Sequence, residues 1–262
     1  MLGKLLKYDL KANRNMFLLM HGILLAVALG SRFSMLEAFE ALQGYSGLGW
    51  VTVLLMITYF IALVAINVMA YVLIIRRFYI NLFGSEGYLS FTLPVTAIQH
   101  FASKVISALI WLLSTVVIQV ISLLITFSGV VELGFFGDFC ETMGEVISQL
   151  FSAGDTIWQV VIGVFNSLAG LYMIYFAICL GQMVNRHRVL SSVLFYLGMN
   201  FFLNLLNGFL KEIFISVDIA ALNGVVSYGT GYYIITVLLL IIKLALFGAG
   251  SVLIMQKKLN LE

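Results

Sequence analysis

Six long apolar runs limit how this chain can fold more than any other feature of its sequence. They cover residues 16–35, 49–75, 104–127, 156–184, 189–210 and 231–255. An α-helix needs about 20 predominantly apolar residues to cross the hydrocarbon layer of a bilayer. The first run is the least regular, because Arg32 interrupts it near its end, but all six approach or exceed this length. The sequence therefore predicts six transmembrane helices.

The composition excludes the main alternatives to a helical membrane protein. Hydrophobic residues make up 62% of the 262 residues and charged residues 10%, against about 45–50% and about 25% in soluble domains. This argues against a soluble enzyme, a disordered chain and a free nucleic-acid-binding protein. The single proline, Pro94, and runs longer than barrel strands of about 9–11 residues argue against a β-barrel. We expect an all-α polytopic membrane protein with one transmembrane domain over residues 1–262.

The first fifteen residues are too polar to span a membrane. Leu2, Leu5 and Leu6 recur at helical spacing among basic residues, which is typical of an amphipathic helix lying on the membrane surface. We expect such an interfacial helix over residues 1–15. An alternative interpretation is a signal peptide with Ala28-Leu29-Gly30 as its cleavage site.

The basic residues indicate the orientation of the spans. If both termini are cytoplasmic, the inner segments hold 11 of the 14 basic residues, the outer segments hold Arg32 and Lys211, and Lys243 lies within a span. The inner ones are Lys4, Lys7, Lys11, Arg14, Arg76, Arg77, Lys104, Arg186, Arg188, Lys257 and Lys258. Because cytoplasmic loops carry the excess of lysine and arginine, we expect both termini of this multi-pass chain in the cytoplasm.

Motifs for enzymatic chemistry are missing from the sequence. It contains neither a GxxxxGK[ST] nor a GxGxxG phosphate-binding loop, and none of its three histidines has a metal-ligand partner at helical spacing. Gly44-Tyr45-Ser46-Gly47 matches the spelling around the serine of rhomboid-type proteases. Ser46 is predicted on the outer side and all three histidines on or nearer the inner side, so no base reaches it. We expect no enzyme, no metal site and no cofactor on this chain.

The inner connection between the second and third runs has an unusual pattern. Gly84-Ser85-Glu86-Gly87 interrupts the helical run, and Tyr88, Leu89, Phe91 and Leu93 then place apolar side chains at the cytoplasmic edge. Pro94 ends this piece and favours a new helix after it. A cytosolic partner that covers these side chains is one explanation. Burial against the membrane surface is the other.

Residues 86–96, Glu-Gly-Tyr-Leu-Ser-Phe-Thr-Leu-Pro-Val-Thr, resemble the E-G-x-L-x-x-x-L-P-V-[ST] segment of permease subunits of ABC-2 type transporters. The likeness is strongest to small bacterial permeases linked to antibiotic or antimicrobial-peptide export, and it extends to the basic start and the six spans. In that family the segment implies a coupling helix that docks on a separate ATPase subunit. The resemblance assigns docking to Glu86, Gly87, Tyr88, Leu89, Ser90, Phe91, Thr92, Leu93 and Pro94.

This resemblance implies an exporter of a peptide antibiotic or an amphipathic drug-like compound in the bacterial plasma membrane. Its partners would be the lipid bilayer, a cytosolic ABC ATPase dimer that binds ATP and Mg, and a second permease copy or paralogue. Residues 81–85 depart from the family by being nearly neutral where a charged lead-in is common. The family also implies a short re-entrant outer piece, for which residues 211–230 are the candidate.

Polar residues within the apolar runs are candidates for a substrate path. Lys243 lies near the middle of the sixth run, where a cation costs about 2.5–3.5 kcal/mol on insertion scales. It either snorkels or pairs structurally, or it lines a translocation path. Asn200, Asn204 and Asn207 share one helical face. They either form interhelical hydrogen bonds or line a polar cavity.

Residues 128–155 have an amphipathic pattern, which predicts a helix on the outer surface that either caps the bundle or senses a substrate.

The rival to an exporter subunit is an ATPase-independent transporter or a membrane scaffold. Many secondary transporters contain inverted repeats and broken helices, and the sequence shows neither.

Overall fold

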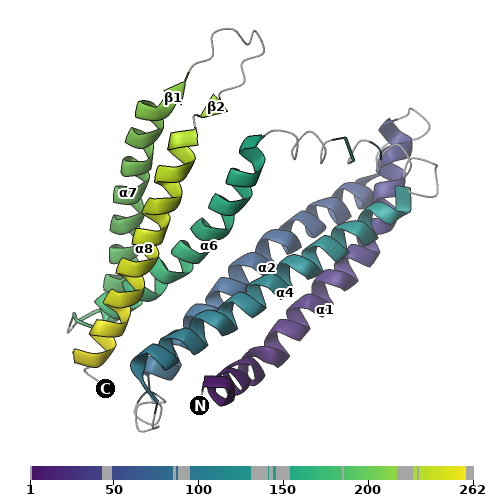
Figure 1. The fold of residues 1–262 in the computed structure, drawn as a ribbon. Helices are drawn as coiled ribbons and strands as arrows, with labels where there is room; N and C mark the ends of the chain where they lie inside the picture. The colour runs from purple at the N-terminus through teal and green to yellow at the C-terminus, as the bar shows by residue number, and fades with distance from the viewer. Residues whose placement is uncertain are drawn as a thin grey trace. The chain divides into compact units, whose positions relative to one another are not determined.

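The computed structural model is almost entirely helical. It describes residues 2–42, 49–84, 87, 95–130, 141, 144–145, 154–184, 186–216, 227–228 and 230–257. The helices are α1 (Leu2–Leu42), α2 (Trp50–Phe83), α4 (Ala97–Val130), α6 (Gly154–Gly181), α7 (Arg188–Phe214) and α8 (Thr230–Lys257). Two-residue strands β1 (Ile215–Ser216) and β2 (Ser227–Tyr228) pair antiparallel between α7 and α8 (Figure 1).

The six predicted spans are confirmed. Within the described part of the chain, six helices are long and apolar enough to cross a membrane. All six helices extend beyond their apolar runs at one end or both; α2, for example, continues to Phe83, and α4 begins at Ala97. A helix can continue past the hydrocarbon layer because it satisfies its own backbone hydrogen bonds in either environment.

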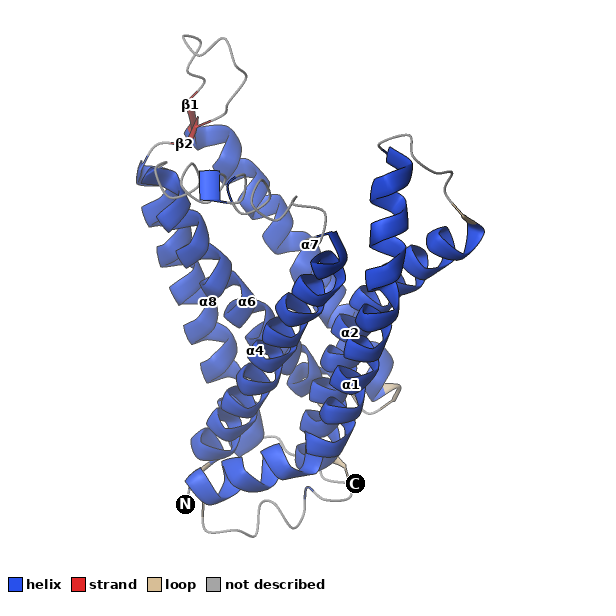
Figure 2. Cartoon of the chain, turned by 90° about the vertical axis from the view of Figure 1, so that its right-hand side faces the viewer, coloured by secondary structure: helices blue, strands red, loops and turns tan. Residues whose placement is uncertain are grey.

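Helix α1 covers two elements that the sequence predicts separately, the interfacial helix over residues 1–15 and the first span over residues 16–35. The predicted interfacial helix and the first span form one element from Leu2 to Leu42. Figure 2 shows that the first turns of α1, beside the N-terminus, run at an angle to the rest of the helix. The predicted outer helix within residues 128–155 and the candidate re-entrant piece at 211–230 lie largely outside the described residues.

The chain forms two compact units. The N-terminal unit comprises Met1–Arg77 and Ala102–Val146, and the C-terminal unit comprises Phe78–Phe101 and Ile147–Glu262. The N-terminal unit therefore contains α1 and most of α2 and α4. The C-terminal unit contains α6, α7 and α8, together with the last turns of α2 and the first turns of α4.

Helix α4 makes polar contacts with both other helices of the N-terminal unit. Its side chains bond to α1 on one side, through Ser31–Thr126 at 3.2 Å, and to α2 on the other, through the Tyr59 hydroxyl and Ser122 at 3.0 Å. Interhelical hydrogen bonds of this kind contribute about 0.6 kcal/mol each in a membrane. An apolar cluster that includes Leu24 also packs between the helices of this unit.

Small residues let the helices of the C-terminal unit approach closely. A Cβ atom added to Gly250 of α8 would lie 2.5 Å from the ring of Phe176 on α6. One added to Gly181, at the end of α6, would lie 1.9 Å from the Ser192 hydroxyl and 2.7 Å from the Arg188 carbonyl oxygen. Van der Waals packing at small residues holds membrane helices together, because burial from lipid gives no hydrophobic gain.

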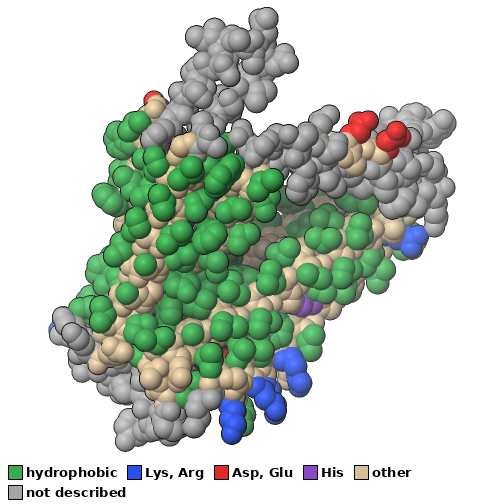
Figure 3. Space-filling model, viewed as in Figure 1, with side chains coloured by type: hydrophobic (Ala, Val, Ile, Leu, Met, Phe, Trp, Pro, Cys, Tyr) green, Lys and Arg blue, Asp and Glu red, His purple; other side chains and the backbone are tan. Residues whose placement is uncertain are grey.

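The surface of the spans is apolar, as a lipid environment requires. Large hydrophobic side chains such as Phe60 and Phe201 are more than 60% exposed. Figure 3 shows hydrophobic side chains over most of the visible helical surface. In the part that contains α1, basic side chains gather toward the end near the N-terminus and acidic ones toward the opposite end.

Candidate functional site

The predicted coupling segment lies between α2 and α4, and only its margins are described. Gly87 is buried, and its N–H donates to the carbonyl of Gly84 at 2.9 Å. Glu86 and residues 88–94 lie outside the described residues. Docking on an ATPase through this segment therefore remains a prediction.

The segment is followed by a well-defined helix start. The backbone N–H of Gln99 donates to the Thr96 hydroxyl, and the Gln99 side-chain carbonyl accepts from the Thr96 N–H, both at 3.3 Å. This reciprocal pair is a capping box, which satisfies amide groups that a helix N-terminus leaves free. It fixes where α4 begins, with Thr96 as the capping residue two positions after Pro94.

An aromatic cluster holds both margins of the segment against α6. Before the segment, Phe78 stacks on Tyr175 with ring centroids 3.9 Å apart and an interplanar angle of 7°. After it, Phe101 contacts Tyr172 edge to face at 5.3 Å. Phe78 and Tyr175 are 1% exposed. The last turns of α2 and the first turns of α4 are therefore both packed on α6.

The predicted path residues come together at one cavity in the C-terminal unit. Lys243, Asn200, Asn204 and Asn207 all line a space of about 200 Å³ between α6, α7 and α8. From α6 the lining includes Asn166 and residues 169, 170 and 173. Helix α6 thus carries one wall of this cavity and, in the same two or three turns, Tyr172 and Tyr175, which contact the margins of the predicted coupling segment.

Asn200 and Asn204 bond along α7, and among the described residues neither bonds to a neighbouring helix. The Asn204 amide donates to the Asn200 carbonyl oxygen, and the Asn200 amide donates to the Tyr196 hydroxyl at 3.4 Å. Each primary amide carries two N–H groups and uses one in this chain of bonds. Of the two roles considered for these residues, this geometry agrees with a polar cavity wall.

Lys243 lies at the centre of its helix. Thirteen residues separate it from Thr230 and fourteen from Lys257, the two ends of α8. Its side chain is much shorter than the roughly 15 Å from the middle of the hydrocarbon layer to either surface, so it cannot snorkel out of the layer. Among the residues that the structure describes, none in the cavity lining is a carboxylate, and Glu212, a partner considered from the sequence, is exposed at the far end of α7.

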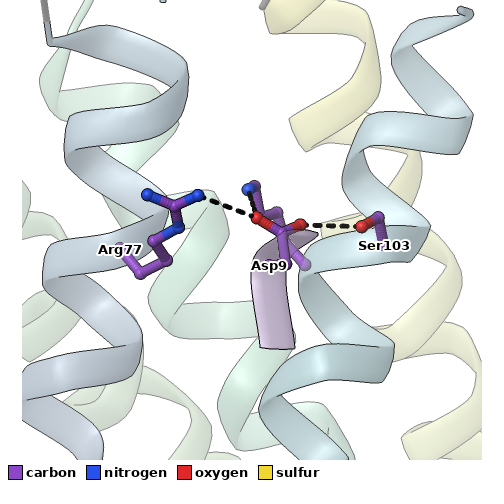
Figure 4. A network of polar contacts seen from close by, with 4 residues as sticks. Asp9, Arg77 and Ser103 are labelled. Atoms are coloured by element: carbon purple, nitrogen blue, oxygen red, sulfur yellow. Dashed lines mark hydrogen bonds and ion pairs between the residues drawn. The ribbon is translucent and has the colours of Figure 1, made fainter. Parts of the chain in front are cut away.

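The structure also reveals a buried ionic network that sequence analysis missed. The Asp9 carboxylate of α1 accepts hydrogen bonds from Lys104 and, at 2.7 Å, from the Ser103 hydroxyl, and it pairs with Arg77 at 3.4 Å. Figure 4 shows Asp9 between Arg77 on α2 and Ser103 on α4. Asp9 is 4% and Lys104 5% exposed. The network therefore joins all three helices of the N-terminal unit at one end.

No group of three or more metal-ligating side chains occurs among the described residues. His21, in α1, contacts the Thr115 hydroxyl of α4 at 3.3 Å, which is a structural contact within the N-terminal unit. Ser46 of the protease-like tetrapeptide lies outside the described residues. Within the described part of the chain, the cavity around Lys243 and the margins of the predicted coupling segment are the strongest candidates for a functional site.

Comparison with known proteins gives no relative: no family model, curated protein or solved structure matches this chain. Its function must therefore be argued from its own residues.

Proposed function

We propose that this chain is the transmembrane subunit of an ABC-2 type exporter, and that a separate cytosolic ATPase dimer powers it. The observation that carries the proposal is the segment at residues 86–96, which follows the coupling pattern of that family and lies between the second and third spans. On this proposal the chain lies in a bacterial plasma membrane with both termini in the cytoplasm.

The aromatic cluster supplies a route from the segment to the spans. The ATPase would bind residues 86–94 from the cytosol and move them as it closes on ATP. Phe78 and Phe101 pack on α6 at the two margins, so the movement would displace α6 and the cavity wall that α6 carries. The ATPase shifts the transporter between two states only if it binds those states with different affinity.

A second subunit completes the proposal. Six helices with a cavity of about 200 Å³ leave little room for a path that crosses the membrane within one chain. We therefore place the path between two copies of this chain, or between this chain and a paralogue. The cargo would be a peptide antibiotic or an amphipathic drug-like compound.

The test is affinity purification of the tagged chain from native membranes, with identification of the chains that accompany it. The wild type should retain an ABC ATPase, and a Glu86→Ala/Leu89→Asp double variant should lose the ATPase while inserting normally. A matched control is Glu212→Ala/Ile213→Asp, which makes the same kinds of change at exposed residues in the last turn of α7, away from residues 86–96 in the sequence. Retention of the ATPase by the first variant, or ATP-independent transport by a chain purified alone, would contradict the proposal.

A further inference from the structure

The cavity around Lys243 has the chemistry of an anion-binding site. Lys243 and the asparagines of α7 line the same space, and the described residues of this lining include no carboxylate. Lysine and amide N–H groups are the donors that bind phosphate and carboxylate oxygens. A bound cation would be repelled by Lys243. We propose that this cavity binds the anionic head group of an amphiphile.

The donors that this binding needs are available. In the chain of bonds from Asn204 through Asn200 to Tyr196, each amide nitrogen keeps one N–H, and the Tyr196 hydroxyl, which accepts from Asn200, keeps its own proton to donate. Together with Lys243 these groups form an array of donors along α7 and α8. An oxyanion with three or more acceptor positions satisfies such an array.

The size of the cavity sets the size of the head group. A water molecule occupies about 30 Å³ of liquid, so a space of about 200 Å³ holds a compact group such as a phosphate with a few waters. Drug-sized ligands fill about 300 Å³ or more. The rest of the ligand must therefore lie outside the cavity.

The surface beside the cavity is suited to an acyl chain. Leu197, Phe201 and Leu205 of α7 are between 47% and 68% exposed and lie at the same level of the helix as Asn200 and Asn204. A free hydrophilic anion would lose its hydration in reaching this depth. An amphiphile reaches it from the lipid, with its chain along α7 and its head group at Lys243.

This ligand class deepens the proposed function, because it names the cargo as an amphiphile with a negatively charged head group. That the ligand is cargo rests on the exporter proposal. The binding itself requires neither the ATPase nor ATP, so binding can be measured on the purified chain and the two ideas can fail separately.

The experiment measures the melting midpoint of the full chain in dodecyl maltoside micelles with increasing dodecyl phosphate. Arms with inorganic phosphate and with dodecyltrimethylammonium separate a free anion and a cationic amphiphile from the proposed ligand. The variants are Lys243→Gln and the charge-retaining Lys243→Arg. Lys4→Gln removes the same charge from the exposed N-terminal turn and serves as the matched control.

Dodecyl phosphate should raise the midpoint by about 5–10 °C at a hundredfold excess over its dissociation constant. The shift should persist in Lys4→Gln, persist in reduced form in Lys243→Arg and vanish in Lys243→Gln. Any one of three results would overturn the proposal. They are an undiminished shift of Lys243→Gln with dodecyl phosphate, an equal shift of the wild type with dodecyltrimethylammonium, and an equal shift of the wild type with inorganic phosphate. If Lys243→Gln does not fold, Asn204→Leu serves instead. This variant should bind dodecyl phosphate at least tenfold more weakly and therefore show a smaller shift, and an unchanged shift would overturn the proposal.

Discussion

Phe78 of α2 lies face to face on Tyr175 of α6, with the two ring centroids 3.9 Å apart. The contact is local to the C-terminal unit, although 97 residues separate the two rings in sequence. Because Phe78 lies only eight residues before Glu86, this contact joins the approach to the coupling segment to a helix that lines the Lys243 cavity.

Replacing Phe78 by Ala should therefore affect both stability and coupling. The lost ring leaves a void beside Tyr175, at a cost of about 3 kcal/mol or less, since burial from lipid contributes less than burial from water. The melting midpoint should fall, and ATP hydrolysis by the assembled complex should no longer respond to cargo. Phe60→Ala removes an equally large side chain that is 66% exposed, and it should change neither property. Equal effects from the two variants would mean that the stacked pair has no special role.

Asp9 should be essential to the stability of the N-terminal unit. Asp9→Asn removes the charge that Lys104 and Arg77 share and leaves Lys104 buried beside a neutral amide. Breaking a buried ion pair from one side costs about 3–5 kcal/mol. The free energy of unfolding in an SDS titration should fall by an amount near this range.

The second-site variant Lys104→Met distinguishes an unpaired charge from lost packing. Added to Asp9→Asn, it removes the buried cation whose contact with the Asp9 carboxylate the first change abolishes, and it should restore part of the lost stability. Glu212→Gln, at an exposed carboxylate, is the control and should have little effect. If the double variant is less stable than either single variant, the network does not act as a charge pair.

The spans could be predicted from sequence because each apolar run is long enough to signal a membrane helix by itself. Lys243 and the asparagines could also be identified as candidates from sequence, because a polar residue within an apolar run is costly and therefore indicates a functional or structural role. Three of the asparagines are close in sequence, and their helical spacing places them on one face without knowledge of the fold.

The ionic network and the aromatic cluster could not be found in this way. Asp9 lies in a segment that reads as the polar face of a surface helix, and its partners Arg77 and Lys104 are 68 and 95 residues away. Phe78 is one of 21 phenylalanines, and nothing local separates a packed ring from a lipid-facing one. A stripe of small hydroxyl residues on α4, including Ser103 and Ser122, does recur at helical spacing and could have indicated the face that packs against α1 and α2.

Gly181 should tolerate no side chain. A methyl group there would meet the Arg188 carbonyl oxygen at 2.7 Å, and this backbone atom cannot rotate away as a side chain could. Gly181→Ala should therefore separate α6 from α7 and cost about 1–3 kcal/mol. Gly163→Ala is the matched change on the same helix, where nothing lies within 4 Å of the new atom, and it should be neutral or stabilise by up to about 1 kcal/mol. Melting midpoints that fall equally for both variants would rule out the close contact.

The predicted orientation can be checked by the labelling of single cysteines in intact cells, in a background that lacks Cys140 and Cys179. Cysteines replacing Lys7 and Arg186, which are exposed, should react with a membrane-impermeant maleimide only after the cells are opened. A cysteine replacing Glu37, exposed toward the other end of α1, should react from outside. The opposite pattern would place the residues around Glu86 on the outer face and would remove the basis for docking on a cytosolic ATPase.

Lys243→Met separates a functional cation from a structural one. A lysine at the centre of a span costs about 2.5–3.5 kcal/mol relative to an apolar residue, and no carboxylate among the described residues of the cavity lining offsets that cost. Methionine fills a similar volume without charge, so the ligand-free variant should be more stable than the wild type by up to this amount. Dodecyl phosphate should then no longer raise its melting midpoint, and export should fail while the ATPase still copurifies. A variant that is less stable without ligand would show instead that Lys243 holds the helices together, and its charge would then be part of the scaffold.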